Sequence, residues 1–425
     1  MVSSLFWFLG HACRFEKEKM KILLVNKFFY FRGGSEYCFF DTACLLQKHG
    51  HKICFFSMHH SQNITSRFSK YFVSNVDFDE GKSFAKKLKF ATKILYSIEA
   101  KRKLETLLND EKPGIAHLHN IHHQISPSII HTLRKKNIPI VMTLHDYKMV
   151  CSSYRLLAIG KLCEQCSGGK YYWGFINHCT KDSYLKSALN VLEMYLHHKL
   201  LQMYDLVDVF ISPSKFLKRK MEEMGFKKRI VYVPNFVNTD EYVPAFDYKE
   251  KAIYYAGRLS EEKGLSTLIE AAKDVDVKLR IMGDGPLREE LEKRKGDKTY
   301  FMGYLPRQKL KNLARQCMAM VMPSEWCENN PRSIIEAFAL GKPVIGARIG
   351  GIPELIRDGE TGLTFESGSV PDLKRKLNRL VSMSKREIRD MGKAARRLVE
   401  EEFSPEKHYE RLTKKYRQAR EHYFR

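Results

Sequence analysis

Residues 328–354 read ENNPRSIIEAFALGKPVIGARIGGIPE, and this stretch carries the pattern that decides the fold. Two glutamates, Glu328 and Glu336, stand in it with seven residues between them. Pro331 suits the first turn of a helix, and the apolar residues after it recur at the spacing of one helical face. The run KPVIG and two consecutive glycines come next. A loop, a helix and a buried strand in this order are typical of an α/β protein with a parallel sheet.

The two carboxylates can be given chemical roles from their positions. Glu336 falls one to two turns into the predicted helix, where it could accept hydrogen bonds from both vicinal hydroxyls of a ribose. The N-terminus of the same helix favours an anion, because its first N–H groups are free. Glu328, on the preceding loop, could reach another hydroxyl of the same ligand. Alternatively, Glu328 is a solvated loop charge and Glu336 an ordinary surface residue.

Strand and helix patterns alternate from the start of the first half of the chain. The run KILLVN at residues 21–26 predicts a buried strand, and the Gly33-Gly34 loop and a helical pattern over residues 36–49 follow it. Further apolar runs end in polar residues, at the positions where ligands of open α/β sheets bind. These polar residues are His119, Asn120, His145 and Asp146.

A second series of strand patterns begins at residue 251, with KAIYYAGRLSEEKG. The chain therefore predicts an α/β protein with two Rossmann-like, doubly wound domains that face each other across a cleft. We expect the following parts: an N-terminal extension (1–19), an N-terminal domain (20–235) with a cysteine-containing insert (151–179), a linker (236–250), a C-terminal domain (251–404) and a final helix (405–425) that packs back on the N-terminal domain.

Two basic residues stand near a strand end of the second series. Arg258 follows the strand, and Lys263 comes five residues later, before Gly264. Such cations can converge on one diphosphate, Arg in fork geometry and Lys as a point charge. Gly33 and Gly34 could bring backbone N–H groups close to a phosphate, although Gly-Gly is more often only a turn. The spacing matches neither a P-loop nor a dinucleotide fingerprint, so both cations could equally be surface residues.

Composition limits the classes of protein. The 425 residues are 44% hydrophobic and 12% aromatic, enough for packed cores, and the formal charge is +24. That charge favours polyanions, phosphorylated substrates or an anionic membrane surface as partners. The apolar run near the N-terminus lacks a basic region and the length of a secretory signal, and no segment is long enough to span a bilayer. We therefore expect a cytoplasmic protein whose ten cysteines are reduced or bind metal.

Four of those cysteines stand in one segment. Two of them have the CxxC spacing of zinc knuckles, and two more could complete a closed tetrahedral site, with His178 as an alternative ligand. The competing interpretation is four reduced thiols in a loop. The predicted ligands of a structural zinc are Cys151, Cys163, Cys166 and Cys179.

Residues 81–103 combine an apolar face with lysines. Such a helix could lie on an anionic bilayer, or its apolar face could pack on the N-terminal sheet while the lysines are solvated. The apolar residues are Phe84, Leu88, Leu95 and Ile98, and the lysines are Lys82, Lys86, Lys89 and Lys93.

Taken together, the motifs resemble glycosyltransferase family 4 from about Met20 to the C-terminus. The specific part is the spacing of the two glutamates together with the run EAFALGKPVIGARIGGIPE, which begins at the second of them, Glu336. The resemblance implies the GT-B fold, sugar transfer from a nucleotide sugar with retention of anomeric configuration, and no catalytic divalent metal. Where the family often has Phe-Gly or Gly-Leu after the first glutamate, this chain has Asn329-Asn330-Pro331.

The resemblance also implies residue roles. Arg258 and Lys263 match the cations that bind the diphosphate, and Glu336 matches the carboxylate that binds ribose. Glu328 matches the glutamate that contacts the donor sugar, and His145 matches a histidine near that sugar. The implied catalytic residues are His145, Glu328, Arg258 and Lys263. The implied donor-binding residues are Gly33, Gly34, Arg258, Lys263, Gly283, Asp284, Glu328, Asn329, Asn330 and Glu336.

We therefore expect a glycosyltransferase of cell-surface polysaccharide or lipopolysaccharide synthesis, using a UDP-, GDP- or ADP-linked sugar and a saccharide or lipid-linked acceptor. It would work in the cytoplasm, with a peripheral contact to the inner face of the membrane. One alternative is a GT-B nucleotide-sugar epimerase, which needs no acceptor. A basic nucleic-acid-binding protein is another, suggested by charge alone. A catalytically silent relative is a third, against which the intact glutamate pair argues.

Overall fold

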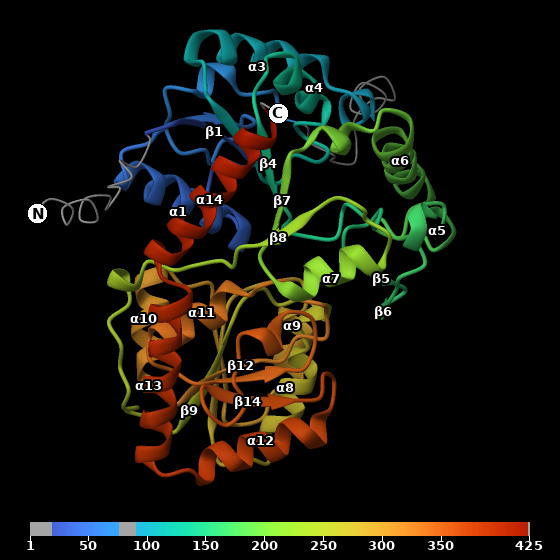
Figure 1. Cartoon of the computed structure of the whole chain (residues 1–425). Coiled ribbons are helices and arrows are strands. Elements are labelled where there is room, and N and C mark those ends of the chain that lie inside the picture. Colours follow the sequence, from blue (N-terminus) through green and yellow to red (C-terminus); the bar gives the residue numbers. More distant parts are fainter. Residues whose placement is uncertain (1–18, 76–90, 424–425) are drawn as a thin grey trace, which may run out of the picture.

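The computed structural model describes residues 19–75 and 91–423, which form two α/β domains stacked end to end (Figure 1). The N-terminal domain is built on a six-stranded parallel sheet in the order β2-β1-β3-β4-β7-β8. Its strands are β1 (Lys21–Val25), β2 (Lys52–Phe56), β3 (Ile115–Leu118), β4 (Ile140–Thr143), β7 (Val209–Ser212) and β8 (Ile230–Tyr232).

The C-terminal domain repeats this plan with a six-stranded parallel sheet in the order β11-β10-β9-β12-β13-β14. The predicted fold class is therefore confirmed. In each sheet the strand order reverses beside the first strand, between β1 and β3 and between β9 and β12. Ligands of doubly wound sheets bind at that point. The strands are β9 (Ala252–Ala256), β10 (Lys278–Met282), β11 (Thr299–Gly303), β12 (Ala319–Met322), β13 (Val344–Ala347) and β14 (Gly362–Phe365).

Helices cover both sheets, and their ends follow ordinary capping rules. Serine side chains cap four of them, including Ser384, which forms a full capping box with Glu387. Gly50, with φ of +83°, follows the C-cap of the first helix, a position that favours glycine. These helices are α1 (Gly34–Lys48), α3 (Ile98–Glu111), α4 (Ser128–Lys135), α7 (Lys215–Glu223), α8 (Leu265–Ala272), α9 (Arg288–Lys293), α10 (Arg307–Gln316), α11 (Arg332–Ala339), α12 (Val370–Ser382) and α13 (Lys385–Glu402).

The chain passes between the domains twice, at neighbouring points. The N–H of Val237, on the outward pass, donates to the carbonyl of Phe403, on the return, at 3.2 Å. The last helix, α14 (Pro405–Tyr423), then packs on the N-terminal domain (Figure 1). Its Tyr416 is buried in that domain's core and bonds to Nδ1 of His117 at 2.8 Å. This helix therefore ties the end of the chain to the first domain.

An insert projects from the N-terminal domain between β4 and β7 (Figure 1). It contains a short hairpin, a one-turn helix and a longer helix that continues in a π-helical turn. These are β5 (Leu157–Ala158) with β6 (Lys161–Leu162), α5 (Trp173–Ile176), α6 (Tyr184–Tyr195) and η3 (Leu196–Leu200).

The basic helix predicted over residues 81–103 is not one element. Residues 91–95 are helical, but Ser97 has an extended backbone and caps α3, whose Ala100 N–H its Oγ accepts at 3.1 Å. Lys93 pairs with Glu99 at 2.7 Å, and Ile98 opens the next helix. The other residues of that prediction, Lys82, Phe84, Lys86, Leu88 and Lys89, lie outside the described residues, as does the predicted extension up to residue 18. Across the described ranges, none of the helices is both long and apolar enough to cross a membrane.

Candidate active site

The reversal point of the C-terminal sheet brings two loops together. The loop after β9 carries Arg258 and ends in a short 3-10 helix, η6 (Glu261–Lys263). Gly264 follows with φ of +65°, and a Cβ there would lie 2.0 Å from the carbonyl oxygen of Pro323, at the end of β12. Only glycine allows this approach. The two loops are therefore held against each other at the strand ends.

At this contact Lys263 and Glu328 form an ion pair. Nζ of Lys263 lies 2.5 Å from Oε1 of Glu328, which also accepts from Oγ of Ser324 at 3.1 Å. The Glu328 side chain is only 10% exposed, and water therefore solvates its carboxylate poorly. The hydrogen bonds from Lys263 and Ser324 stabilise the negative charge instead. The indole of Trp326 lies 5.3 Å from the ammonium group, within cation–π range. The sequence-predicted cation and carboxylate thus meet directly.

The two glycines after β13 explain how the Glu328 loop keeps its position. A Cβ on Gly350, whose φ is +59°, would lie 2.4 Å from the carbonyl oxygen of Glu328. A Cβ on Gly351 would lie 1.7 Å from that of Asn329, and the Gly351 N–H donates to the Glu328 carbonyl at 2.7 Å. The backbone of the glycine pair therefore packs directly against the backbone of Glu328 and Asn329 and fixes the position of this loop.

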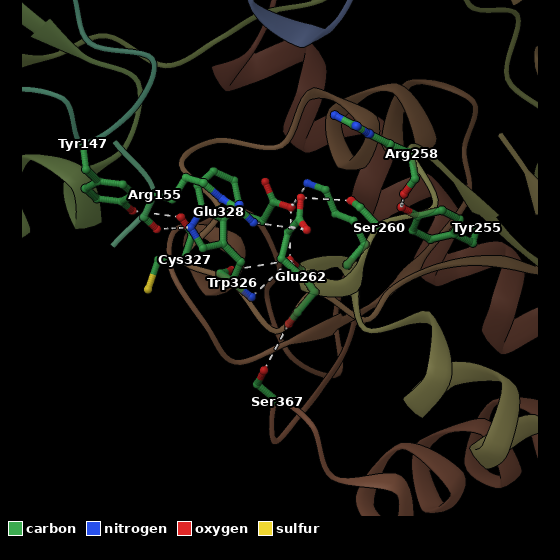
Figure 2. A network of polar contacts seen from close by, with 12 residues as sticks. Tyr147, Arg155, Tyr255, Arg258, Ser260, Glu262, Trp326, Cys327, Glu328 and Ser367 are labelled. Carbon is green, nitrogen blue, oxygen red and sulfur yellow. Dashed lines mark hydrogen bonds and ion pairs between the residues drawn. The ribbon is translucent and has the colours of Figure 1, made fainter. Parts of the chain in front are cut away.

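Arg258 and the next strand end stand beside this pair. The Arg258 side chain is exposed, while its carbonyl accepts from Oη of Tyr255 at 2.9 Å (Figure 2). Gly283 has φ of +146°, and a Cβ there would lie 1.8 Å from the Gly257 carbonyl oxygen. The exposed Asp284 caps its own loop through the Gly285 N–H at 2.8 Å. Gly283 is thus needed for close packing of the loops that follow β9 and β10.

Glu336 faces the N-terminal domain from α11. That helix begins at Arg332 with Pro331 as its N-cap, one residue later than predicted. Oε1 of Glu336 accepts from Nε of Arg332 and from Oη of Tyr242, both at 2.9 Å. Arg332 also reaches Asp41 of α1 at 2.5 Å. Among the described residues, no hydrogen bond or ion pair joins Glu336 to the Lys263–Glu328 pair.

The opposite side of the boundary carries His145, just beyond β4. Its Nε2 lies 2.9 Å from Nδ1 of His119, which follows β3. Burial, with a smaller effect from the nearby Lys27 charge, lowers the pKa of His145 to about 4, so the ring is neutral at pH 7. Nε2 of His119 is buried without a partner. A neutral, oriented imidazole at this edge can donate or accept one hydrogen bond toward the domain boundary.

The Gly33-Gly34 loop begins α1 next to further ionisable groups. Gly33 is the N-cap and Gly34 the first helical residue. Glu36, in the first turn, is buried and accepts from Nδ2 of Asn26 at 3.4 Å. Lys27 is half-buried, and its desolvation lowers its pKa, while Asp146 and Glu36 act against that shift. The loop therefore lies beside a cluster of partly buried charges.

The domains are joined by bonds that start at the Glu328 loop. Oη of Tyr147 donates to the Cys327 carbonyl at 2.9 Å (Figure 2). Asn329 accepts from Ser214 at 2.7 Å and donates to the Leu144 carbonyl at 3.1 Å. Asn330 makes two comparable bonds with Asn235. Both asparagines thus hold the domains together, a role that the sequence did not predict and that their amide side chains alone would not reveal.

The four cysteines of the insert lie near one another. Burial, together with Cys151, Cys166 and Cys163, raises the pKa of Cys179 to about 12, and burial raises that of Cys166 to about 11. Residues 19–75 and 91–423 contain no group of three His, Cys, Asp or Glu side chains arranged to share a metal ion. His178 lies 3.7 Å from Asp182 instead. The thiols are therefore neighbours without forming a metal site in this conformation.

Two family models match the chain in succession. Residues 32–241 match a model described as Glycosyltransferase Family 4, and residues 238–398 match one described as Glycosyl transferases group 1. The boundary between the models coincides with the first passage between the domains.

Curated relatives match between about two fifths and four fifths of the chain. The chain is 31% identical to the uncharacterized glycosyltransferase MJ1178 of Methanocaldococcus jannaschii over 41% of this chain and 50% of the relative. It is 24% identical to an uncharacterized 42.6 kDa protein in the cps region of Klebsiella pneumoniae, over 80% and 88%. It is 26% identical to the lipopolysaccharide core biosynthesis glycosyltransferase LpsE of Rhizobium meliloti, over 46% and 61%. The chain thus spans about half the length of MJ1178, the first of these relatives.

Solved structures share the whole architecture. Sucrose-phosphate synthase of Thermosynechococcus elongatus superposes with a TM-score of 0.71 over 94% of this chain and 99% of that one, at 17% identity. Anabaena HepE, in complex with UDP and glucose, superposes with a TM-score of 0.64 over 93% and 99%, at 16% identity. The two-domain GT-B fold is therefore shared across nearly the full length.

Proposed function

This chain belongs to the glycosyltransferases, with a family 4 half followed by a group 1 half, and on that basis we propose that it transfers a sugar from a nucleotide sugar to a saccharide or lipid-linked saccharide. The observation that carries the proposal is the Lys263–Glu328 pair at the reversal point of the C-terminal sheet. A cation and a carboxylate at this place can bind the two halves of a nucleotide sugar, its diphosphate and its glycosyl group.

The chemistry asks for a cation beside the leaving group. When the bond from the anomeric carbon to phosphate breaks, negative charge grows on the diphosphate. Lys263, and Arg258 if its exposed side chain folds inward, would stabilise that charge. Glu328 would hold hydroxyls of the donor sugar, and the neutral His145 would approach the same sugar from the N-terminal domain. Glu336 would accept the ribose hydroxyls on the carboxylate oxygen that Tyr242 and Arg332 leave free.

We propose that transfer retains the anomeric configuration. The new bond to the acceptor oxygen forms on the face from which the diphosphate leaves, and the departing phosphate oxygen takes the acceptor proton. Under this scheme no side chain has to act as general base. The two glutamates are then not the acid and base of a glycosidase, because they bind different parts of the donor. The family resemblance predicts that a chelator leaves the rate unchanged.

A uridine nucleotide is the first donor to test. The HepE structure is a complex with UDP and glucose, and LpsE is named for lipopolysaccharide core biosynthesis. These relatives support a UDP-sugar donor and a role in surface polysaccharide or lipopolysaccharide synthesis. The acceptor would be reached from the cytoplasm, at the inner face of the membrane.

The test is sugar transfer itself. Purified protein is incubated with UDP-, GDP- or ADP-sugars, with and without a lipid-extracted saccharide fraction, and products are followed by mass spectrometry and NMR. Acceptor-dependent release of the nucleoside diphosphate and an anomer matching the donor are expected. Donor conversion without any acceptor would point to the epimerase, and an inverted anomer would overturn retention.

We also propose that the four insert cysteines bind a structural zinc ion in the native protein. Their proximity supports this, although the side chains would have to turn toward a common centre. Zinc would hold four thiolates and lock the insert, with no part in the reaction. Elemental analysis of freshly reduced protein should find about one zinc per chain. Removing the metal with a chelator should lower the melting temperature of the protein. A metal-free sample would leave the cysteines as free thiols.

A further inference from the structure

Helix α6 buries mostly polar side chains and exposes two leucines. Its buried residues are Ser187, Asn190, Glu193 and Met194, of which one is apolar, whereas Leu185 and Leu192 are 79% and 54% exposed. Surface helices normally do the reverse, with an apolar stripe against the core. The outward leucines recur at helical spacing, so they form a stripe and are not isolated residues.

The polar face is held inward by well-formed contacts. Glu193 is fully buried and receives Nζ of Lys148 at 2.8 Å, with Nδ1 of His123 at 3.2 Å. Asn190 donates to Oγ1 of Thr180 at 2.8 Å. Turning the helix by half a turn would leave a buried lysine without its carboxylate, at high cost. The rotation that exposes the leucines is therefore built into the domain.

The exposed apolar surface continues beyond α6. Ten of the 16 exposed large hydrophobic residues in the described part of the chain lie between residues 154 and 200. Leu200 follows on the π-helical turn at 75%, and α5 adds Ile176 at 50%. The rings of Phe175 and Tyr184 lie 5.5 Å apart and join the two helices. A concentration of this kind marks a binding surface. We call these exposed residues of α5, α6 and η3 the insert face.

The charges around the insert face identify its partner. Between residues 154 and 200, five lysines but two carboxylates are exposed, and one of the two carboxylates, Glu164, is paired with Lys220 at 2.9 Å. Aromatic rings such as Tyr172 and Tyr184 are also exposed. Leucines, aromatic rings and lysines together suit the boundary of an anionic bilayer. The exposed lysines of the segment are Lys161, Lys170, Lys181, Lys186 and Lys199.

We propose that the insert face docks this protein on a membrane with anionic headgroups. The inference rests on the proposed function only for its purpose, which is to bring a lipid-linked acceptor to the cleft. Figure 1 shows α5 and α6 at the outer edge of the N-terminal domain, away from the C-terminal one. The insert also reaches the site, because Nε1 of Trp326 donates to the Arg155 carbonyl at 2.5 Å. Docking therefore places the membrane on the side of the histidine-bearing domain.

The test is sedimentation of the full chain with vesicles of phosphatidylcholine alone or with one third phosphatidylglycerol, at low and high salt. Replacing Leu185, Leu192 and Leu200 by Gln should lower binding to the anionic vesicles at least tenfold. The matched control replaces Val243 and Ile64, which are 61% and 41% exposed elsewhere, by Gln and should bind like wild type. Changing Lys186 and Lys199 to Gln should remove most of the salt dependence.

Several outcomes would overturn the proposal. One is wild-type binding by the triple leucine variant, and another is loss of binding only when Lys82, Lys86, Lys89 and Lys93 are changed to Gln. A wild-type dimer that the leucine variant converts to monomers would show that a second copy covers the insert face. Thermal stabilisation by the nucleotide, measured on every variant, separates membrane docking from the proposed function. If the nucleotide does not stabilise wild type, this counts against the proposed function. If it stabilises a variant that no longer sediments with vesicles, the fold of that variant is intact.

Discussion

Nζ of Lys263 lies 2.5 Å from Oε1 of Glu328, across the point where the strand order of the C-terminal sheet reverses. The pair joins the loop after β9 to the loop after β12, and Gly264 and Gly350 allow both loops to pack tightly enough for it to form. One contact thus sets the position of the cation and of the carboxylate that we propose bind the diphosphate and the donor sugar.

Removing the cation should slow the reaction far more than it weakens the fold. Lys263→Ala should lower kcat about 100- to 1000-fold, as expected for loss of one group that stabilises charge in the transition state. Lys263→Ala also leaves the largely buried Glu328 carboxylate without its cation, so the melting temperature should fall as well, and kcat is compared at a temperature where both proteins are folded. The control is Lys298→Ala, which removes an exposed lysine paired with Asp276. Equal activity of the two variants would make Lys263 a surface residue.

Glu336→Gln should weaken donor binding about 10- to 150-fold, the equivalent of about 1.5–3 kcal/mol for a charged hydrogen bond. The amide can no longer accept two ribose hydroxyls while it also receives Tyr242 and Arg332. Calorimetric titration with the donor measures the change. Tyr242→Phe removes one of the structural bonds and keeps the carboxylate, so it should bind the donor almost normally. The same affinity in wild type and Glu336→Gln would remove Glu336 from the donor site.

Gly350→Ala should disrupt the Glu328 loop. The added methyl group would meet the Glu328 carbonyl oxygen at 2.4 Å and its nitrogen at 2.6 Å. Gly359 gives a matched control, because its φ of +81° is equally unusual but no atom lies within 4 Å of its Cβ position. We expect both alanine variants to lose about 1–2 kcal/mol of stability from the backbone conformation, and only Gly350→Ala to lose donor binding. Donor binding that survives in Gly350→Ala would show that close packing of Gly350 against Glu328 is not required for the donor site.

Acid should destabilise the N-terminal domain through its buried histidines. Burial lowers the pKa of His117 to about 3 and that of His145 to about 4, whereas an unfolded histidine titrates near 6.5. Below pH 6.5 the unfolded chain therefore binds protons that the folded chain does not. As the pH falls from 6.5 to the pKa of the folded state, each such histidine lowers the free energy of unfolding by about 1.4 kcal/mol per pH unit.

Urea unfolding of wild type and His117→Gln at pH 7 and pH 5 isolates one histidine, since all other groups are common to both proteins. The wild type should lose more stability between these pH values than the variant does. A pH dependence that is identical in both would show that His117 is not kept neutral by the fold.

The sequence was sufficient for features that depend on local pattern. Apolar runs located the first strand of each sheet, β1 and β9, and the spacing of Glu328 and Glu336 placed them on a loop and on the following helix. The strands β5, β6 and β8 were missed, because runs of two or three residues show no clear period, and β14 was missed as well.

What depends on tertiary contacts could not be predicted. The asparagines after Glu328 bind the other domain through Ser214 and Asn235, residues that lie far away in sequence. The outward leucines of α6 depend on a buried partner, Lys148, whose pairing with Glu193 no periodicity reveals. An amphipathic pattern predicts that a helix has an apolar and a polar face, but which face is buried depends on the tertiary contacts.

Binding of a nucleotide sugar at the Lys263–Glu328 pair is the central claim, and a thermal-shift titration with UDP, GDP, ADP and their sugars tests it most directly. One nucleotide should raise the melting temperature of wild type in a saturable way, because a ligand that binds only the folded state stabilises it by mass action. The same nucleotide should have little effect on Lys263→Ala. A wild type that none of these ligands stabilises, or equal stabilisation of wild type and variant, would contradict the claim.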